Sequence, residues 1–154
     1  MRLALLLLAA SLALAGCESL GGPERLVADL RVQGFRAAIG THYDDALLGG
    51  QGTTVCVGND TVSVLEFPDV NSTIEAAAKI DRNDPSHVGN GIVEWVGSPR
   101  FWLRDRAIVL YVGDDAGVDL ALRNILGPPF AEGPGWGGRG GPGGPQRPPC
   151  ERAD

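Results

Sequence analysis

The first sixteen residues decide which part of this chain can fold. Met1 and Arg2 precede an almost unbroken apolar run from Leu3 to Ala15. A run of about 13 apolar residues behind one positive charge is typical of an export signal, and it is too short to span a membrane comfortably as a permanent helix. We therefore expect residues 1–16 to be a signal peptide that is removed, so that the mature protein starts at residue 17.

The apolar run ends in Leu14-Ala15-Gly16-Cys17, where small residues stand directly before a cysteine. This motif resembles the lipobox of bacterial prolipoproteins. The resemblance covers residues 1–18 and implies that the Cys17 thiol receives a diacylglycerol group and that the new amino terminus is often acylated too, with fatty acids such as palmitate. Two chains suffice for stable anchoring, since each buried methylene contributes roughly 0.8 kcal/mol. The alternatives are an ordinary signal peptide with an accidental cysteine, or a buried hydrophobic helix.

Residue 18 bears on where the anchored protein resides. By resemblance to Gram-negative lipoproteins, Glu18 in place of Asp after the cysteine implies release to the outer membrane, facing the periplasm. In an organism with one membrane, the anchor implies the outer face of the cell membrane. Ser19–Pro23 forms a short tether, which reaches less than about 20 Å even when extended. We therefore expect a domain held close to a membrane of the cell envelope.

Composition limits the mature chain to one small domain. Cys17–Asp154 provides about 138 residues, enough for a domain of about 110 residues and a tail. The expected limits are residues 24–131 for the domain and 132–154 for the tail. Removing Arg2 with the signal leaves a net charge of −7. An acidic domain without a basic stripe argues against nucleic acid as a partner and against electrostatic binding to anionic lipid.

With Cys17 assigned to lipid, Cys56 and Cys150 are the remaining cysteines of the chain. In an exported, oxidising compartment these two can form a disulfide. Its loop of about 95 residues would add at most about 4.6 kcal/mol in the chain-entropy model. The alternative is that Cys56 is a small buried residue of a strand and that Cys150 is a free thiol of the tail.

Periodicity and turn residues predict an α+β fold. Apolar residues at helical spacing predict three helices, at Glu24–Gln33, Val70–Ile80 and Ala116–Leu126. Strands are predicted at Phe35–Ile39, Thr53–Val57, Thr61–Phe67, Ile92–Val96 and Ala107–Val112. Loops are predicted at Gly40–Gly52 and Asp81–Asn90. Because adjacent strands are separated by helices, we expect a small two-layer domain, with an antiparallel sheet of about four or five strands covered on one face by about three helices.

A second pattern lies in the C-terminal half of the domain. Trp95–Phe101 reads W-V-G-S-P-R-F, Ile108–Asp115 reads I-V-L-Y-V-G-D-D, and Leu126–Phe130 reads L-G-P-P-F. The pattern resembles the C-terminal half of a family of small uncharacterised bacterial lipoproteins. The resemblance implies the same domain limits and the same anchor, and it implies no catalytic residue.

Aromatic residues concentrate around the later strands, at Trp95, Phe101, Trp102 and Tyr111. Each aromatic side chain buries about 150–250 Å² as a rule, and such residues most often fill a core. The sharper alternative is a ligand groove walled by Trp95 and Trp102, with Phe101 beside them. Both interpretations stay open at the level of sequence.

The sequence predicts no metal site, no cofactor and no catalytic residue. His42 and His87 lie in different predicted loops, without another His or Cys at metal-ligand spacing. The loop Asp81–His87 has calcium-like oxygens, but a proline occupies a ligand position and the characteristic glycine is missing. Asp114 and Asp115 fit the cap of the last helix better than an acid pair that binds metal. No serine lies in a nucleophile elbow.

The segment Gly133–Asp154 is mostly Gly, Pro and Arg. Such a composition favours disorder, because it buries too little apolar surface to offset the entropy of ordering. Its match to G-x-G-x-x-G follows a helix terminator and opens no helix, so we interpret it as a chance match. The alternative is a contact arm toward peptidoglycan or an envelope protein, gripping through Trp136, Arg139 and Arg147.

Together these features predict a non-enzymatic envelope lipoprotein, a small module that binds or spaces something at the membrane. The alternative is a small-molecule or peptide-binding accessory of an envelope transport or assembly system, using the aromatic strand pair. An enzyme is the least favoured class, because it would need titratable groups that converge in one cleft.

Overall fold

The structure is a computed structural model that describes residues 22–134 and Cys150. The predicted signal peptide and the lipidation site Cys17 lie outside the described residues. So do residues 135–149 and 151–154 of the predicted tail, with Trp136, Arg139 and Arg147.

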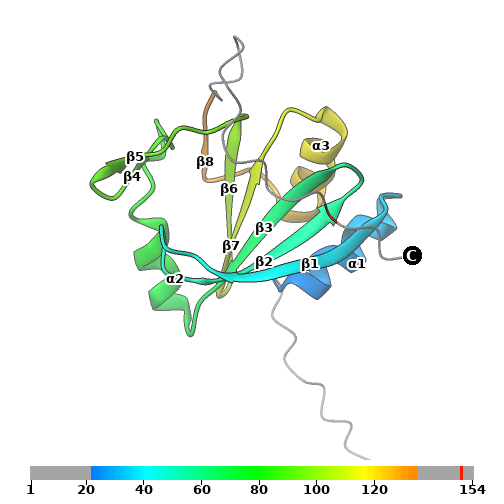
Figure 1. The fold of residues 1–154 in the computed structure, drawn as a ribbon, viewed down its shortest axis with the longest axis horizontal. Helices are drawn as coiled ribbons and strands as arrows, with labels where there is room; N and C mark the ends of the chain where they lie inside the picture. Colours follow the sequence, from blue (N-terminus) through cyan, green and yellow to red (C-terminus); the bar gives the residue numbers. More distant parts are fainter. Residues whose placement is uncertain (1–21, 135–149, 151–154) are drawn as a thin grey trace, which may run out of the picture.

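Three helices and eight strands follow one another along the described residues (Figure 1). The helices are α1 Pro23–Val32, α2 Val70–Ala77 and α3 Ala116–Leu126. The first strands are β1 Ala37–Asp44, β2 Gln51–Val57, β3 Asp60–Glu66 and β4 His87–Val88. The later strands are β5 Gly91–Ile92, β6 Pro99–Arg104, β7 Ala107–Val112 and β8 Ala131–Glu132.

One antiparallel sheet of six strands organises the domain, in the order β1-β2-β3-β7-β6-β8. The first three strands form a meander, and the β6–β7 hairpin joins it through β7, where Val64 pairs with Val109. Strands β4 and β5 form a separate two-stranded ribbon. The α+β class, the three helices and the antiparallel sheet are confirmed. The sheet has six strands instead of four or five, because Pro99–Arg104 pairs along its whole length and β8 adds at its edge.

The helices divide between the two faces of the sheet. Successive strand residues point to opposite faces, so β3 sends Val62 and Val64 to one side and Leu65 to the other. The first side packs on α1 and α3, through residues such as Leu30 and Leu122. We call it the α1/α3 face. The opposite side, the α2 face, packs on Ala76 and on the segment that carries β4 and β5. The expectation of three helices on one face was therefore wrong, because the central strands are apolar on both sides.

Local caps account for where the helices begin. Asp69 caps α2, since its side chain accepts a hydrogen bond from the Ser72 N–H at 2.8 Å, and this bond holds the Asp69 pKa below its usual value of 3.8. Asp115 caps α3 by accepting from the N–H groups of Gly117 and Val118. Of the two aspartates predicted as caps of α3, the structure uses Asp115.

Several predicted boundaries were wrong. The predicted loop Asp81–Asn90 contains the two-residue strand β4. The predicted loop Gly40–Gly52 is strand up to Asp44, because β1 continues along β2 with a bulge between Ile39 and His42. The predicted strand Ile92–Val96 is strand only at β5, and the side chains of Ile92 and Val96 are 73% and 70% exposed. These two side chains are apolar but do not belong to the core.

Candidate functional site

A disulfide joins Cys56 to Cys150, with their Cα atoms 5.8 Å apart. Cys56 lies in β2 opposite Ala38 of β1 and Thr61 of β3. Its neighbours Val55 and Val57 point into the core on the α1/α3 face, so the Cys56 side chain points to the α2 face. The bond therefore attaches Cys150 to the meander on the side away from α1 and α3.

The structure does not bring Trp95 and Trp102 into one groove. Trp102 is 1% exposed in the core of the α1/α3 face, and its indole N–H donates to the Gly127 carbonyl at 2.8 Å. Trp95 belongs to the core of the α2 face, and its N–H donates to the Pro85 carbonyl at 2.9 Å. Only Phe101 lies beside Trp95, edge to face, with ring centroids 5.8 Å apart. The two tryptophans are thus on opposite sides of the sheet, and both fill core.

A small surface hollow lies next to Trp95. Its volume is about 260 Å³, and its lining includes Asp84, Pro85, Ser86, Glu94 and Gly133. This is just under the volume of about 300–1,000 Å³ that ligand pockets usually have. Trp95 is 9% exposed, so it offers the hollow little more than an edge of its ring.

In the loop Asp81–His87, which has calcium-like oxygens, the carboxylates accept hydrogen bonds from other groups of the same loop. Asp81 accepts hydrogen bonds from the N–H groups of Asn83 and Asp84. Asp84 accepts from the Ser86 hydroxyl and lies 2.9 Å from Nδ1 of His87. The Ser86 hydrogen bond is the largest cause that lowers the Asp84 pKa. No group of three or more His, Cys, Asp or Glu side chains that could hold a metal ion occurs within residues 22–134 or at Cys150.

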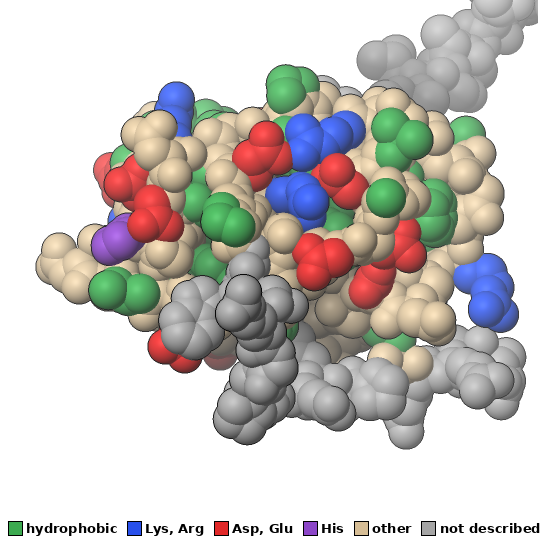
Figure 2. Space-filling view, turned by 90° about the horizontal axis from the view of Figure 1, so that it is seen from above, with side chains coloured by type: hydrophobic (Ala, Val, Ile, Leu, Met, Phe, Trp, Pro, Cys, Tyr) green, Lys and Arg blue, Asp and Glu red, His purple; other side chains and the backbone are tan. Residues whose placement is uncertain are grey.

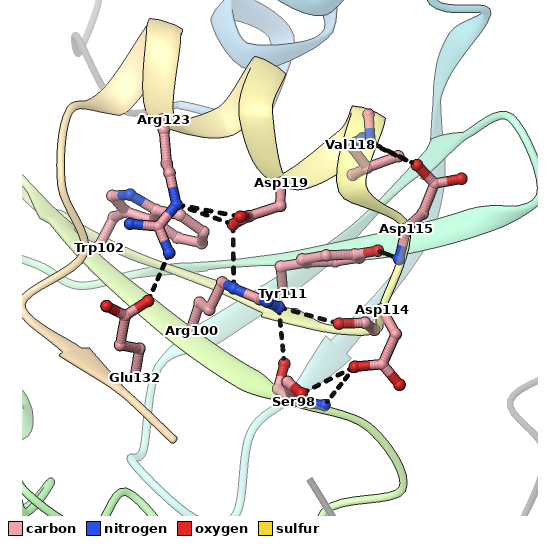
Figure 3. Close-up of polar contacts among 12 residues, drawn as sticks. Ser98, Arg100, Trp102, Tyr111, Asp114, Asp115, Val118, Asp119, Arg123 and Glu132 are labelled. Atoms are coloured by element: carbon pink, nitrogen blue, oxygen red, sulfur yellow. Dashed lines mark hydrogen bonds and ion pairs between the residues drawn. The ribbon is translucent and has the colours of Figure 1, made fainter. Parts of the chain in front are cut away.

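An ion-pair network joins α3 to the edge strands β6 and β8 (Figure 3). Asp119 of α3 receives Arg100 Nε at 2.9 Å and Arg123 Nε at 3.0 Å, and Arg123 also pairs with Glu132. Arg100 donates further to the carbonyl of Gly113 at 2.9 Å. In the space-filling view, acidic and basic side chains are interspersed on the face shown (Figure 2). The network fastens the last helix across the edge of the sheet.

The second aspartate of the predicted acid pair belongs to this region. Asp114 accepts a hydrogen bond from the Ser98 hydroxyl at 2.7 Å, while Asp115 caps α3 (Figure 3). The two carboxylates therefore have separate partners. Sequence reasoning missed the network around Asp119, although Asp119 and Arg123 stand four residues apart, which is the spacing of a helical ion pair.

Tyr111 is a buried phenol whose hydroxyl links three elements. It donates to Asp60 Oδ2 at 3.2 Å at the start of β3 and accepts from the Asp115 N–H at 3.1 Å at the start of α3. A Cβ on Gly113 would come within 2.6 Å of the Tyr111 ring, so the close approach requires glycine there. Burial is the largest cause that raises the Tyr111 pKa above its usual value of 10.0, and the Asp60 carboxylate adds to it.

This pKa shift predicts a loss of stability at alkaline pH. Because the folded pKa of Tyr111 lies above the unfolded one, its contribution to stability is complete below pH 10.0 and is lost as the pH rises through the folded pKa. The difference in tyrosinate absorbance between the wild-type chain and Tyr111→Phe isolates this phenol. We expect that difference to stay near zero where a free tyrosine ionises and to appear only at higher pH or on unfolding. Ionisation of Tyr111 at the pH of a free tyrosine would contradict the burial argument.

No helix within residues 22–134 is long and apolar enough to cross a membrane. Comparison of the chain with protein-family models, with curated proteins and with solved structures finds no match.

Proposed function

We propose that this protein is a membrane-anchored envelope lipoprotein, in which a small α+β domain binds or spaces something at the membrane without catalysing a reaction. The observation that carries the proposal is the lipobox Leu14-Ala15-Gly16-Cys17 directly after an apolar export signal. The acylated Cys17 is then the protein's contact with the lipid bilayer. Glu18 favours the outer membrane, facing the periplasm, where the cell has two membranes.

The position of α1 supports a domain held near the membrane surface. Helix α1 begins at Pro23, six residues after Cys17. At about 3.3 Å per residue, these six residues span about 20 Å when fully extended. A domain on so short a tether works at the membrane surface, within reach of a partner there and not far out in the periplasm.

The disulfide supports export. Cys56 and Cys150 are joined in the structure. Structural disulfides persist in oxidising compartments such as the bacterial periplasm and the cell surface, and they are rare in the cytosol. A chain that carries both an export signal and this bond fits a role outside the cytoplasm.

The partners of the polar side chains support a binding or spacing role. Asp115 and Asp69 cap helices, Asp114 binds Ser98, and Asp119 holds two arginines. The two caps hold the starts of their helices, and Asp114 and Asp119 fasten one segment of the fold to another. The alternative of a ligand-binding accessory that uses the Trp95 and Trp102 pair loses its groove, since the two rings lie on opposite faces of the sheet.

Metabolic labelling with palmitate tests the anchor. We expect the wild-type chain to be labelled and Cys17→Ser to lose all label and to remain unprocessed or soluble. Cys150→Ser is the matched control, because it also removes one thiol but leaves the lipobox intact, so it should keep the full label. Continued labelling of Cys17→Ser would show that the lipid is attached elsewhere and would refute the proposal.

A further inference from the structure

The Cys56–Cys150 disulfide joins the domain to a residue that its cores do not use. The two hydrophobic cores draw their residues from Leu26 to Ala131, and neither cysteine belongs to them. Cys150 lies 94 positions after Cys56 in the sequence. Cys150 itself is partly exposed. The packing of the domain is therefore complete without it.

The surroundings of the bond leave it open to an attacking thiol. Cys56 and Cys150 are both partly exposed. Cys56 lies one strand in from the sheet edge, and besides its partner Ala38, Gly40 of β1 also lies close to its sulfur. A Cβ on Gly40 would lie 3.2 Å from Cys56 Sγ and 3.1 Å from the Thr54 carbonyl. A side chain at position 40 would therefore crowd the sulfur. The partial exposure of the two cysteines leaves the bond accessible, and access is one of the factors that set the rate of thiol–disulfide exchange.

The chain has no competing thiol if Cys17 is lipidated. It contains three cysteines in all. Under the proposed function Cys17 is blocked as a thioether, so Cys56 and Cys150 can pair only with each other within one molecule. A bond that is broken can then re-form without scrambling. This step rests on the proposed function.

We propose that the Cys56–Cys150 disulfide is a redox-reversible clasp, opened by an external dithiol, which releases Cys150 from β2 while the α+β domain stays folded. The reactant class is a dithiol such as the Cys-x-x-Cys pair of a thiol–disulfide oxidoreductase, in a compartment where such exchange takes place. Cys150 is thereby held on β2 in the oxidised state and is free of β2 in the reduced state.

The chemistry balances as a two-electron exchange. A thiolate of the dithiol attacks Sγ of Cys150, and a mixed disulfide forms. The Cys56–Cys150 bond breaks, and its electron pair leaves on Cys56 Sγ, which takes up a proton from water. The second thiol of the dithiol loses its proton and attacks the mixed disulfide. Cys150 then leaves as a thiolate that is protonated in turn, and the dithiol ends as a disulfide.

Reduction of the full-length mature protein under native conditions tests the clasp. The protein is treated with millimolar dithiothreitol, the free thiols are alkylated, and the mass is measured together with the far-UV circular dichroism. We expect two alkyl groups per chain, an unchanged spectrum and a reduction rate within about tenfold of that in urea, because access sets the rate. Loss of the spectrum on reduction, or a bond reduced only after unfolding, would overturn the proposal. Three alkyl groups would instead mean that Cys17 is free, and so would count against the lipid anchor.

Two glycine variants separate a local effect on the bond from general destabilisation. Gly40→Ala places a Cβ beside Cys56 Sγ, and we expect it to shift the equilibrium with a glutathione buffer several-fold toward the reduced form. Gly50→Ala is the matched control, because its Cβ is equally crowded, 3.0 Å from the Phe67 ring and 3.2 Å from the Glu66 carbonyl, but away from the sulfur. The control should leave the equilibrium unchanged. Equal shifts in both variants would mean that reduction follows global unfolding, which contradicts a clasp that opens in the folded protein.

Discussion

The Trp102→Ala variant is expected to be the least stable single core variant of the domain, with a free energy of unfolding lower by about 3–5 kcal/mol. The Trp102 indole is 1% exposed, and it packs between the sheet and the helices α1 and α3. Its N–H also ties β6 to the end of α3 through the Gly127 carbonyl. Since domains of this kind are stable by about 5–15 kcal/mol, one such loss removes much of the total.

Urea denaturation followed by circular dichroism measures this effect. Trp102→Phe is the matched control, because it keeps an aromatic ring in the core while it removes the N–H and part of the indole, so it should cost less than Trp102→Ala. Trp95→Ala should also cost less, since its neighbours include the loop around Pro85, which can relax into the gap. If Trp102→Ala folded with wild-type stability, the ring would not fill the core and the groove interpretation would return.

Elements whose signals are local were predicted well from sequence. Helix α3 has the predicted bounds, because its apolar stripe, its cap Asp115 and its terminator Gly127 all lie in one continuous segment of the chain. The β2–β3 hairpin was predicted for the same reason, from two β-branched runs on either side of a turn at Gly58. Short-range signals of this kind need no knowledge of the rest of the chain.

Elements that depend on distant partners were not predicted. The second half of β1, from Gly40 to Asp44, has little strand character of its own, and it is held by pairing with β2 across a bulge. The stretch after Ile92 has strand character but turns away from the sheet, because the Trp95 side chain packs inward and binds Pro85. In both cases the tertiary contact overrides the local propensity.

The candidate site shows the same difference between features with local signals and features that depend on distant partners. Sequence identified Cys56 and Cys150 as a pair that could bond, and the loop entropy could be calculated without knowing the fold. It could not tell on which face of the sheet the bond lies. For Trp95 and Trp102 the nearness in sequence was misleading, because residues before and within a strand can point to opposite sides of a sheet. Of the ion-pair network, only the Asp119–Arg123 pair is visible in sequence, since Arg100 comes from another element.

Removal of the disulfide is the other large effect, and Cys150→Ser is expected to lower the free energy of unfolding by about 2–4 kcal/mol, with about 4.6 kcal/mol as the ceiling of the chain-entropy model. The physical cause lies in the unfolded chain, where the bond across 94 positions restricts the conformations that the chain can visit. The cores between Leu26 and Ala131 are untouched, so the far-UV spectrum of the folded variant should equal that of the wild type.

Removal of the disulfide should change the slope of the urea transition as well as its midpoint. Without the bond the unfolded chain expands and exposes more surface, so the dependence of the unfolding free energy on urea should become steeper. Cys56→Ser and the double variant should match Cys150→Ser within about 0.5 kcal/mol, since all three remove the same single bond. If neither the free energy of unfolding nor its dependence on urea changed, the bond would not restrain the unfolded chain. A large loss of stability with an altered native spectrum would place its effect in the folded state, and the domain would then depend on the bond that we propose it can open.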